Sequence, residues 1–256
     1  MATTTNNRGI HYDDKGRKIF VPLENNPAVF NDLIHRLGLS PKLGFYDVYS
    51  IDEPDLLALV PRPVHALIFI APAPVYYRVR EHDGSGEITY DKAGEQEPVM
   101  WFEQTIGNAC GLYSLIHAVA NGSATQYIEQ DSLIDKLLAE ALPLKRAQRA
   151  DVLYNSKALE EAHMSCAING DSIVPEANEP VGYHFITFAK GKDGHLWELE
   201  GDWNPIDRGV LDDSDDMLSE KALELGIRKF VRECQATGLI EFSIIALATR
   251  PEDEDN

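Results

Sequence analysis

The sequence predicts an α/β protein in which helices pack around a central sheet. Two observations lead to this fold class. Short apolar runs typical of strands alternate with stretches of helical periodicity, and the last three strand-like runs follow most of the helices. The chain has 256 residues and contains no low-complexity linker and no internal repeat, so we expect one domain.

Apolar periodicity and β-branched runs assign the elements one by one. Helices are expected over residues 27–38, 52–59, 104–121, 131–141, 146–162 and 216–235. Strands are expected over residues 65–70, 75–79, 183–189, 195–200 and 241–247. Residues 165–182 fit neither period and are rich in Asn, Gly, Pro and Ser. A long irregular stretch inside a compact domain is often functional, although a tolerated insertion is the alternative.

Composition excludes several classes of protein. The chain carries 23 Lys and Arg against 42 Asp and Glu, a net charge of −19, which opposes general binding to nucleic acid or acidic membranes. No stretch approaches the roughly 18 apolar residues that a membrane span needs, and the first residues lack the apolar core of a signal peptide. Three cysteines without a C-x-x-C motif indicate a reduced, cytoplasmic protein without a metal or cofactor.

The most informative stretch is QTIGNACGLYSLIHAVA at residues 104–120. Its apolar residues repeat at i, i+3, i+4 and i+7 and form one buried helical stripe: Leu112, Leu115, Ile116 and Val119. Cys110 stands just ahead of that stripe, at the expected helix N-terminus, where free N–H groups favour a thiolate. Cys110 is therefore a candidate nucleophile, and the alternative is a buried structural cysteine beside a packing glycine.

The residues around Cys110 are compatible with its role as a nucleophile. Gly107 and Gly111 have no side chains to stop a substrate backbone from approaching. The side-chain amide of Gln104, together with free N–H groups, could bind a developing oxyanion. His117 lies seven residues along the same helix, about 10.5 Å away, which is too far for a hydrogen bond, so the base must come from elsewhere.

A predicted hairpin supplies the base. The strands at 183–189 and 195–200 flank a five-residue loop that contains glycine. If residue 189 faces residue 195, His184 faces Glu200 at roughly 5 Å, where an acid can orient an imidazole. Asp202 shares that face one diagonal step beyond His184 and is the alternative acid. A surface His–Glu pair is the interpretation if Cys110 is not a nucleophile.

The remaining cysteines and histidines have no such setting. Cys166 falls in the irregular segment and Cys234 in an apparent helix, so both are expected to be structural. The other histidines have no comparable acid and are assigned to the surface or to packing: residues 11, 35, 65, 82, 163 and 195.

Together these segments resemble the ubiquitin C-terminal hydrolases, a papain-like family of cysteine deubiquitinases. The matching motifs are QTIGNACG at 104–111, LIHAVAN at 115–121, HFITF at 184–188 and DGHLWELEG at 193–201. Further matches are the stretch at 55–66, Asn26-Pro27 ahead of a helix, and the final strand at 242–247. The resemblance spans residues 23–247.

The resemblance implies a chemistry and a fold. It implies Cys110 as the nucleophile, His184 as the general acid and base, and Gln104 as the oxyanion donor. It also implies a papain-like fold with a central antiparallel sheet and a knotted backbone. Ubiquitin would be both substrate and product of a monomeric enzyme that hydrolyses bonds after its terminal glycine, in the cytoplasm, with a nuclear pool left open.

The resemblance also assigns segments. Residues 165–182 fall where the family has its crossover loop, which limits the size of the leaving group. Leu23, Glu24 and Asp47 match positions that contact ubiquitin in relatives. The expected organisation is then a loosely ordered arm, a catalytic domain and an acidic tail, at residues 1–22, 23–249 and 250–256.

One position departs from the family pattern. The third catalytic residue of the family is an aspartate, and this chain has Glu200 instead. Because glutamate is one methylene longer than aspartate, the side chain of Glu200 must retract or shift to reach the same imidazole nitrogen. We expect it still to orient His184, and Asp202 is the alternative acid. Two other functions stay open: a ubiquitin-binding protein with weakened chemistry, and a hydrolase of a related ubiquitin-like modifier.

Overall fold

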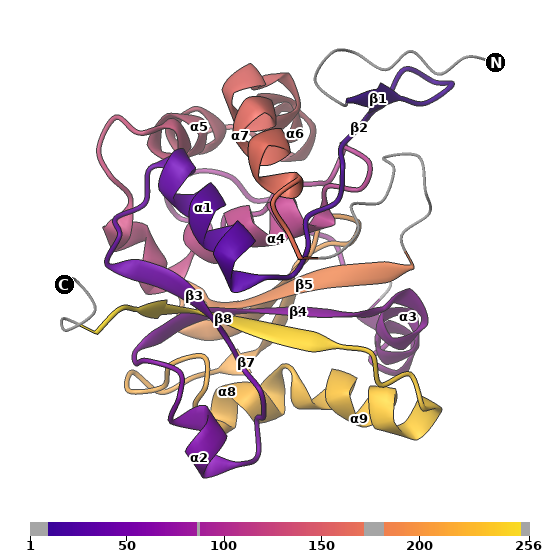
Figure 1. Ribbon diagram of the computed structural model, residues 1–256, viewed down its shortest axis with the longest axis vertical. Coiled ribbons are helices and arrows are strands. Elements are labelled where there is room, and N and C mark those ends of the chain that lie inside the picture. Colours follow the sequence, from indigo (N-terminus) through magenta and orange to yellow (C-terminus); the bar gives the residue numbers. More distant parts are fainter. Residues whose placement is uncertain (1–9, 86–87, 172–181, 252–256) are drawn as a thin grey trace.

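A six-stranded antiparallel sheet forms the centre of the protein (Figure 1). The computed structural model describes residues 10–85, 88–171 and 182–251. In spatial order the strands are β3 (Leu43–Asp47), β8 (Ser243–Thr249), β4 (Val64–Pro72), β5 (Tyr183–Lys190), β6 (His195–Leu199) and β7 (Ile206–Val210). A separate two-stranded hairpin consists of β1 (His11–Tyr12) and β2 (Lys18–Ile19).

Helices cover both faces of this sheet (Figure 1). One face carries α1 (Pro27–Leu37), α4 (Cys110–Val119), α5 (Leu133–Ala141), α6 (Arg146–Asn155) and α7 (Lys157–Ala167). The other face carries α2 (Pro54–Leu57), α8 (Glu220–Leu225) and α9 (Arg228–Thr237). The helix α3 (Ala73–His82) follows β4 directly, and a 3-10 helix, η2 (Gly122–Tyr127), follows α4.

The central strand β4 separates two hydrophobic cores. Ala66 and Ile68 belong to the core under α1 and α4, whereas Leu67 and Phe69 belong to the core on the side of α9. Successive side chains of a strand point to opposite faces, so a strand that is covered on both sides is apolar at every position. The predicted α/β class with an antiparallel sheet flanked by helices is confirmed, and the knotted backbone stays a prediction.

The nucleophile helix is shorter than predicted. We expected a helix over 104–121, and α4 begins only at Cys110. The preceding residues are held in an extended path because Gly107 bridges Ile19 and its N–H donates to the carbonyl oxygen of Lys18 at 2.9 Å. Asn108 then adopts a left-handed conformation with φ of 56°, which turns the chain into the helix.

Other boundaries also differ from the sequence prediction. The expected strand at 75–79 is wrong, because these residues lie in α3. The expected helix at 146–162 is interrupted at Ser156, whose side chain caps α7 by accepting a hydrogen bond from the Leu159 N–H at 3.2 Å. The helix expected at 216–235 is divided into α8 and α9. The strands β3 and β7 were not predicted.

The structure adds detail to the predicted arm and to the irregular segment. Within the arm, Ile10 and Phe20 are buried in the core, and the Phe20 N–H donates to the carbonyl oxygen of Gly107 at 2.9 Å. The irregular segment predicted at 165–182 begins as helix, since α7 continues to Ala167. Its residues 172–181 lie outside the described residues, as do residues 1–9 and 252–256.

Candidate active site

Cys110 is the first residue of α4, six residues after the predicted start of this helix. Burial raises the pKa of its thiol to about 12, and the N–H groups of Gly111 and of Cys110 itself offset only part of that rise. The negative charges of Asp202 and Glu200 add to it. The N–H groups at the helix N-terminus act in the expected direction, but in this state removing the thiol from water outweighs them.

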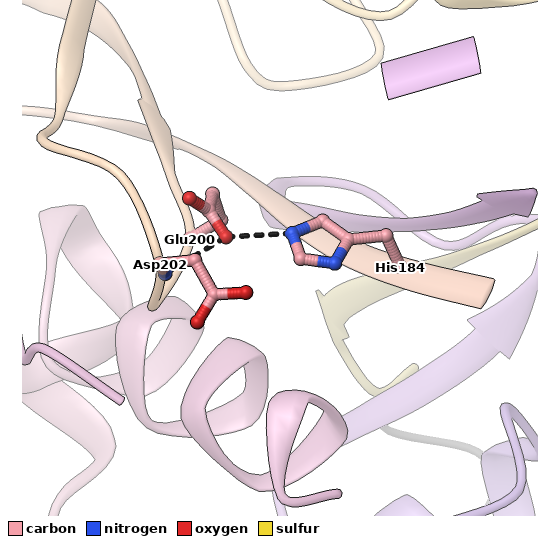
Figure 2. Close-up of side chains that lie close together, drawn as sticks. All are labelled: His184, Glu200 and Asp202. Carbon is pink, nitrogen blue, oxygen red and sulfur yellow. Dashed lines mark hydrogen bonds and ion pairs between the residues drawn. The ribbon is translucent and has the colours of Figure 1, made fainter. Parts of the chain in front are cut away.

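His184 and Glu200 form the central pair of the site (Figure 2). The imidazole Nε2 of His184 lies 2.7 Å from Glu200 Oε2, and both side chains are buried. Burial alone lowers the pKa of His184, but the hydrogen bond to Glu200 and its charge outweigh this, so the pKa is raised. With Nε2 bound to the acid, Nδ1 is the nitrogen that can exchange a proton with a nucleophile.

The hairpin reaches this geometry through a different register from the predicted one. Thr187 pairs with Leu199, so the strands are shifted by two residues from the predicted pairing of residue 189 with residue 195. A shift of two residues keeps every side chain on its predicted face. Glu200 therefore still points toward His184, and its longer side chain covers the added diagonal distance.

Asp202 lies next to the pair but does not bond to His184. Its backbone N–H donates to Glu200 Oε2 at 3.0 Å, which fixes the oxygen that holds the imidazole (Figure 2). Partial burial and the charge of Glu200 raise the pKa of the Asp202 carboxyl. The ligand atoms of His184, Glu200 and Asp202 lie within 4.8 Å of one another, close enough for a metal ion. Because the histidine nitrogen is already bonded to Glu200, we interpret the cluster as acid–base machinery.

Gln104 is held close to the acid by the backbone. Its N–H donates to the carbonyl oxygen of Gly201 at 2.9 Å, and the indole of Trp101 donates to the carbonyl oxygen of Glu200 at 2.6 Å. The side-chain Nε2 of Gln104 donates to the carbonyl oxygen of Ile106 at 3.0 Å, and its second hydrogen can serve an oxyanion. A Cβ on Gly201 would lie 2.3 Å from the Cβ of Gln104, so only glycine fits there.

Two polar side chains from α4 and from the residues just after it hold the segment that carries Gln104. His117 is buried, and its Nε2 accepts a hydrogen bond from the Phe102 N–H at 3.0 Å. Burial lowers the pKa of His117 to about 4, so it is neutral. The amide of Asn121 bonds both the N–H and the carbonyl oxygen of Met100. Sequence reasoning missed Asn121, whose signal was a polar residue directly after an apolar helix.

The glycines around Cys110 pack closely against neighbouring side chains. A Cβ on Gly107 would lie 3.1 Å from the side chain of Ile19, and one on Gly111 would lie 3.2 Å from Leu23. This packing is a further reason for glycine at both positions, and the close approach of a substrate backbone stays a prediction. Leu23, which was expected to contact ubiquitin, is only 5% exposed and packs against Gly111, the residue after the nucleophile.

The other two expected contact residues are more accessible. Glu24 is half-buried, packs against Gly170, and lines a surface depression of about 390 Å³. The depression also includes Tyr183, the residue before His184, and it is lined by Glu24, Asn25, Ile70, Tyr183, Glu241, Phe242 and Ser243. Asp47 is half-buried at the end of β3 and is not part of this lining.

The nucleophile and the base are not yet bonded in this structure. Among the interactions of the described residues there is no hydrogen bond between Cys110 Sγ and His184. Cys166 and Cys234 are buried, as expected of structural cysteines, although Cys166 lies in α7 rather than in a loop. The expectation that no other histidine has an acid partner is wrong for His195, whose Nδ1 lies 2.8 Å from Asp207 Oδ2.

A cysteine that begins a helix, a histidine held by an acid on a neighbouring strand, and a side-chain amide ahead of the cysteine define a papain-like thiol hydrolase. The family model described as ubiquitin carboxyl-terminal hydrolase, family 1, matches residues 20–232. The chain therefore belongs to this family, and the resemblance noted in the sequence is confirmed: it is a cysteine-type ubiquitin C-terminal hydrolase.

Individual relatives agree with this assignment. The chain is 34% identical over 228 residues to the ubiquitin carboxyl-terminal hydrolase isozyme L1 of Equus caballus, covering 88% of this chain and 96% of the relative. It is 31% identical over 238 residues to a probable ubiquitin carboxyl-terminal hydrolase of Dictyostelium discoideum, covering 93% and 91%.

A solved structure shows the same fold. The UCH37 catalytic domain of Trichinella spiralis, bound to ubiquitin vinyl methyl ester, superposes with a TM-score of 0.66 at 20% identity. This likeness covers 91% of the present chain and 96% of that structure. Separately, none of the helices in the described part of the chain is long and apolar enough to cross a membrane.

Proposed function

We propose that this enzyme cleaves ester, thioester, amide or peptide bonds after the C-terminal glycine of ubiquitin, releases small leaving groups and recycles ubiquitin. The observation that carries the proposal is the 2.7 Å contact between His184 Nε2 and Glu200 Oε2, which leaves Nδ1 for proton transfer. The solved relative bound to ubiquitin vinyl methyl ester supports ubiquitin as the partner.

The mechanism follows from the positions of four side chains. Cys110 gives its proton to His184 Nδ1, and Sγ attacks the glycyl carbonyl carbon. The oxyanion accepts hydrogen bonds from the Gln104 amide and the N–H groups at the start of α4. His184 then protonates the leaving group, and the acyl-enzyme is hydrolysed by a water that His184 deprotonates. Glu200 stabilises the imidazolium in both steps.

Labelling with ubiquitin vinyl methyl ester tests the nucleophile. The wild-type chain should form a covalent adduct one ubiquitin heavier, and Cys110→Ala should form none while retaining its thermal unfolding temperature. Cys166→Ala is the matched control and should label like the wild type. A folded wild-type chain that binds ubiquitin without forming an adduct would favour the binding protein with weakened chemistry. Faster labelling by the vinyl methyl ester of a ubiquitin-like modifier would favour the other alternative.

We further propose that residues 165–182 act as the crossover loop that restricts leaving groups, and that Glu24 contacts ubiquitin. Glu24 supports this because it packs against Gly170 of that segment and lines the depression beside Tyr183. Comparing hydrolysis of ubiquitin joined to a short peptide with ubiquitin joined to a folded protein tests the restriction. Equal rates for both would contradict it.

We also propose a monomeric enzyme in the cytoplasm, with a nuclear pool as the alternative. The net charge of −19 supports the expectation that it does not bind nucleic acid. Sedimentation of the purified chain and imaging of a fluorescent fusion test these two points separately.

A further inference from the structure

Tyr76 packs directly against the catalytic histidine, and no motif in the sequence pointed to it. Its ring centroid lies 4.5 Å from that of the His184 imidazole at an interplanar angle of 38°. The residue is 1% exposed and belongs to α3. One turn later on the same helix, the guanidinium of Arg80 lies 4.9 Å from the Tyr76 ring centroid. The tyrosine therefore covers the imidazole of His184 from the side of α3.

Several polar atoms beside this contact, including two of opposite hydrogen-bonding character, lack the partners that buried groups require. The hydroxyl of Tyr76 and the Oε1 atom of Glu200 are both buried, and neither has a hydrogen-bond partner among the described residues. The Tyr76 ring packs against an imidazole that is itself 2.7 Å from Glu200, so both unpartnered atoms belong to one cluster of side chains. Burial raises the pKa of Tyr76, and the negative charge of Glu200 raises it further. A hydroxyl donor beside a carboxylate acceptor is the pairing that satisfies both atoms.

We propose that Tyr76 is a positioning residue for the His184–Glu200 pair, with its hydroxyl donating to Glu200 Oε1 and its ring supporting the imidazole. Glutamate has one more rotatable bond than aspartate, so it needs more restraint to hold an imidazole in one orientation. His184 and the Asp202 N–H fix Oε2. Tyr76 fixes the other oxygen. This inference deepens the proposed function and rests on it.

Packing alone would not require the hydroxyl. The ring of Tyr76 also contacts the core, with its centroid 6.4 Å from that of Phe230, and a phenylalanine would fill the same space. The variant Tyr76→Phe therefore separates the two roles, because it keeps the ring against His184 and removes only the donor. Tyr77→Phe is the matched control, since Tyr77 is the next residue of α3 and is 51% exposed.

The kinetic test is a double-mutant cycle with a fluorogenic ubiquitin C-terminal amide. Tyr76→Phe should lower kcat by roughly 3- to 10-fold, the size of one net hydrogen bond, and leave KM unchanged. In a Glu200→Asp background the shorter acid moves away from the hydroxyl, so the same substitution should lower kcat less than about 2-fold. Tyr77→Phe should retain the wild-type kcat. An equal loss in both backgrounds, or no loss in either, overturns the proposal.

A thermal unfolding test does not depend on activity. If the hydroxyl pairs with Glu200, Tyr76→Phe leaves a buried carboxylate oxygen without its donor, and Tm falls. If the hydroxyl has no partner, removing it raises Tm, and the proposal is wrong. A wild-type chain that does not hydrolyse the ubiquitin amide would defeat the proposed function, while the direction of the Tm change would still decide the pairing of Tyr76.

Discussion

At the scale of single residues, the length of the acid and the register of the hairpin fit one another. Continuing the observed pairing of Thr187 with Leu199 would place residue 202, not residue 200, opposite His184. An acid at 200 must therefore reach along a diagonal, which the additional methylene of a glutamate allows. The backbone N–H of Asp202 then holds the carboxylate of Glu200 by donating to its Oε2.

This arrangement predicts different outcomes for the two carboxylates. Glu200→Gln should lower kcat by about 10²-fold, because a neutral amide no longer stabilises the imidazolium of His184. Asp202→Asn should change kcat by less than about 3-fold, since the contribution of Asp202 to Glu200 comes from its backbone N–H. Turnover of a fluorogenic ubiquitin amide measures both. Full activity in Glu200→Gln, or a loss confined to Asp202→Asn, would contradict this assignment and indicate that Asp202 orients His184.

The raised pKa of Cys110 predicts a slow reaction with small alkylating reagents in the absence of ubiquitin. A group whose pKa is raised to about 12 is almost entirely a neutral thiol at pH 7.5. Compared with a free cysteine of pKa about 8.5, alkylation by iodoacetamide should be about 10³-fold slower at that pH and should accelerate about tenfold per pH unit. Mass spectrometry of the Cys110 peptide measures the rate. A fast rate that is constant between pH 6 and pH 9 would instead indicate a preformed thiolate–imidazolium pair.

At the scale of secondary-structure elements, apolar spacing in the sequence correctly predicted elements that bury a continuous face. The amphipathic stripe of α4 and the buried strand β4 were read from apolar spacing, since each element buries a continuous face. The strand predicted at 75–79 failed because Val75, Tyr76 and Val79 have high β-propensity, yet they are buried as the inner face of α3. Tertiary packing overrode propensity there, and this error hid Tyr76 from the predicted site.

The register of the β5–β6 hairpin is a second feature that the local sequence pattern predicted only in part. The sequence predicted which residues share a face, because alternation along a strand is local. It did not predict which residues pair, because Lys190 pairs with Leu196, which moves the centre of the loop from Lys192 to Asp193. Gly191 donates to the carbonyl oxygen of His195 at 2.8 Å, and Gly194 has a positive φ of 78°. Both are details of turn conformation that spacing alone does not encode.

The contact between two extended segments predicts a strong effect at Gly201. A methyl group there would lie 2.3 Å from the Cβ of Gln104, so Gly201→Ala must separate the segment carrying the oxyanion donor from the segment carrying Glu200. We expect kcat to fall by at least about 10-fold, because a small displacement of an oxyanion donor weakens the transition state. The Kd for ubiquitin should stay unchanged, measured on Cys110→Ala chains with and without Gly201→Ala. An unchanged kcat would show that Gln104 is not the oxyanion donor.

At the scale of the whole molecule, the site is assembled from segments that are distant in the sequence. The nucleophile comes from the start of α4, the base from β5, and the acid from the residue after β6. Each residue type was predictable because each stands in its own local motif. Their orientation was not, because it depends on the sheet order that places β5 between β4 and β6. The raised pKa of Cys110 likewise comes from burial, which no local motif records.

The net charge of −19 leads to a prediction about substrate capture. The C-terminal tail of ubiquitin is basic, and the depression beside Tyr183 carries Glu24 and Glu241 on its lining. An acidic approach attracts a basic tail over about a Debye length, so raising salt from about 50 to about 300 mM should increase KM by ~3-fold with little change in kcat. Initial rates with a fluorogenic ubiquitin amide measure both constants.

A matched pair of variants locates the source of this attraction. Glu241→Gln should raise KM at low salt and flatten its dependence on salt, because it removes a charge from the depression beside Tyr183. Glu140→Gln removes the same charge from α5, and because Glu140 does not line that depression, this variant should leave both unchanged. If the two variants behave alike, the net charge of the whole molecule governs capture. If KM does not respond to salt at all, the acidic excess has no part in substrate binding.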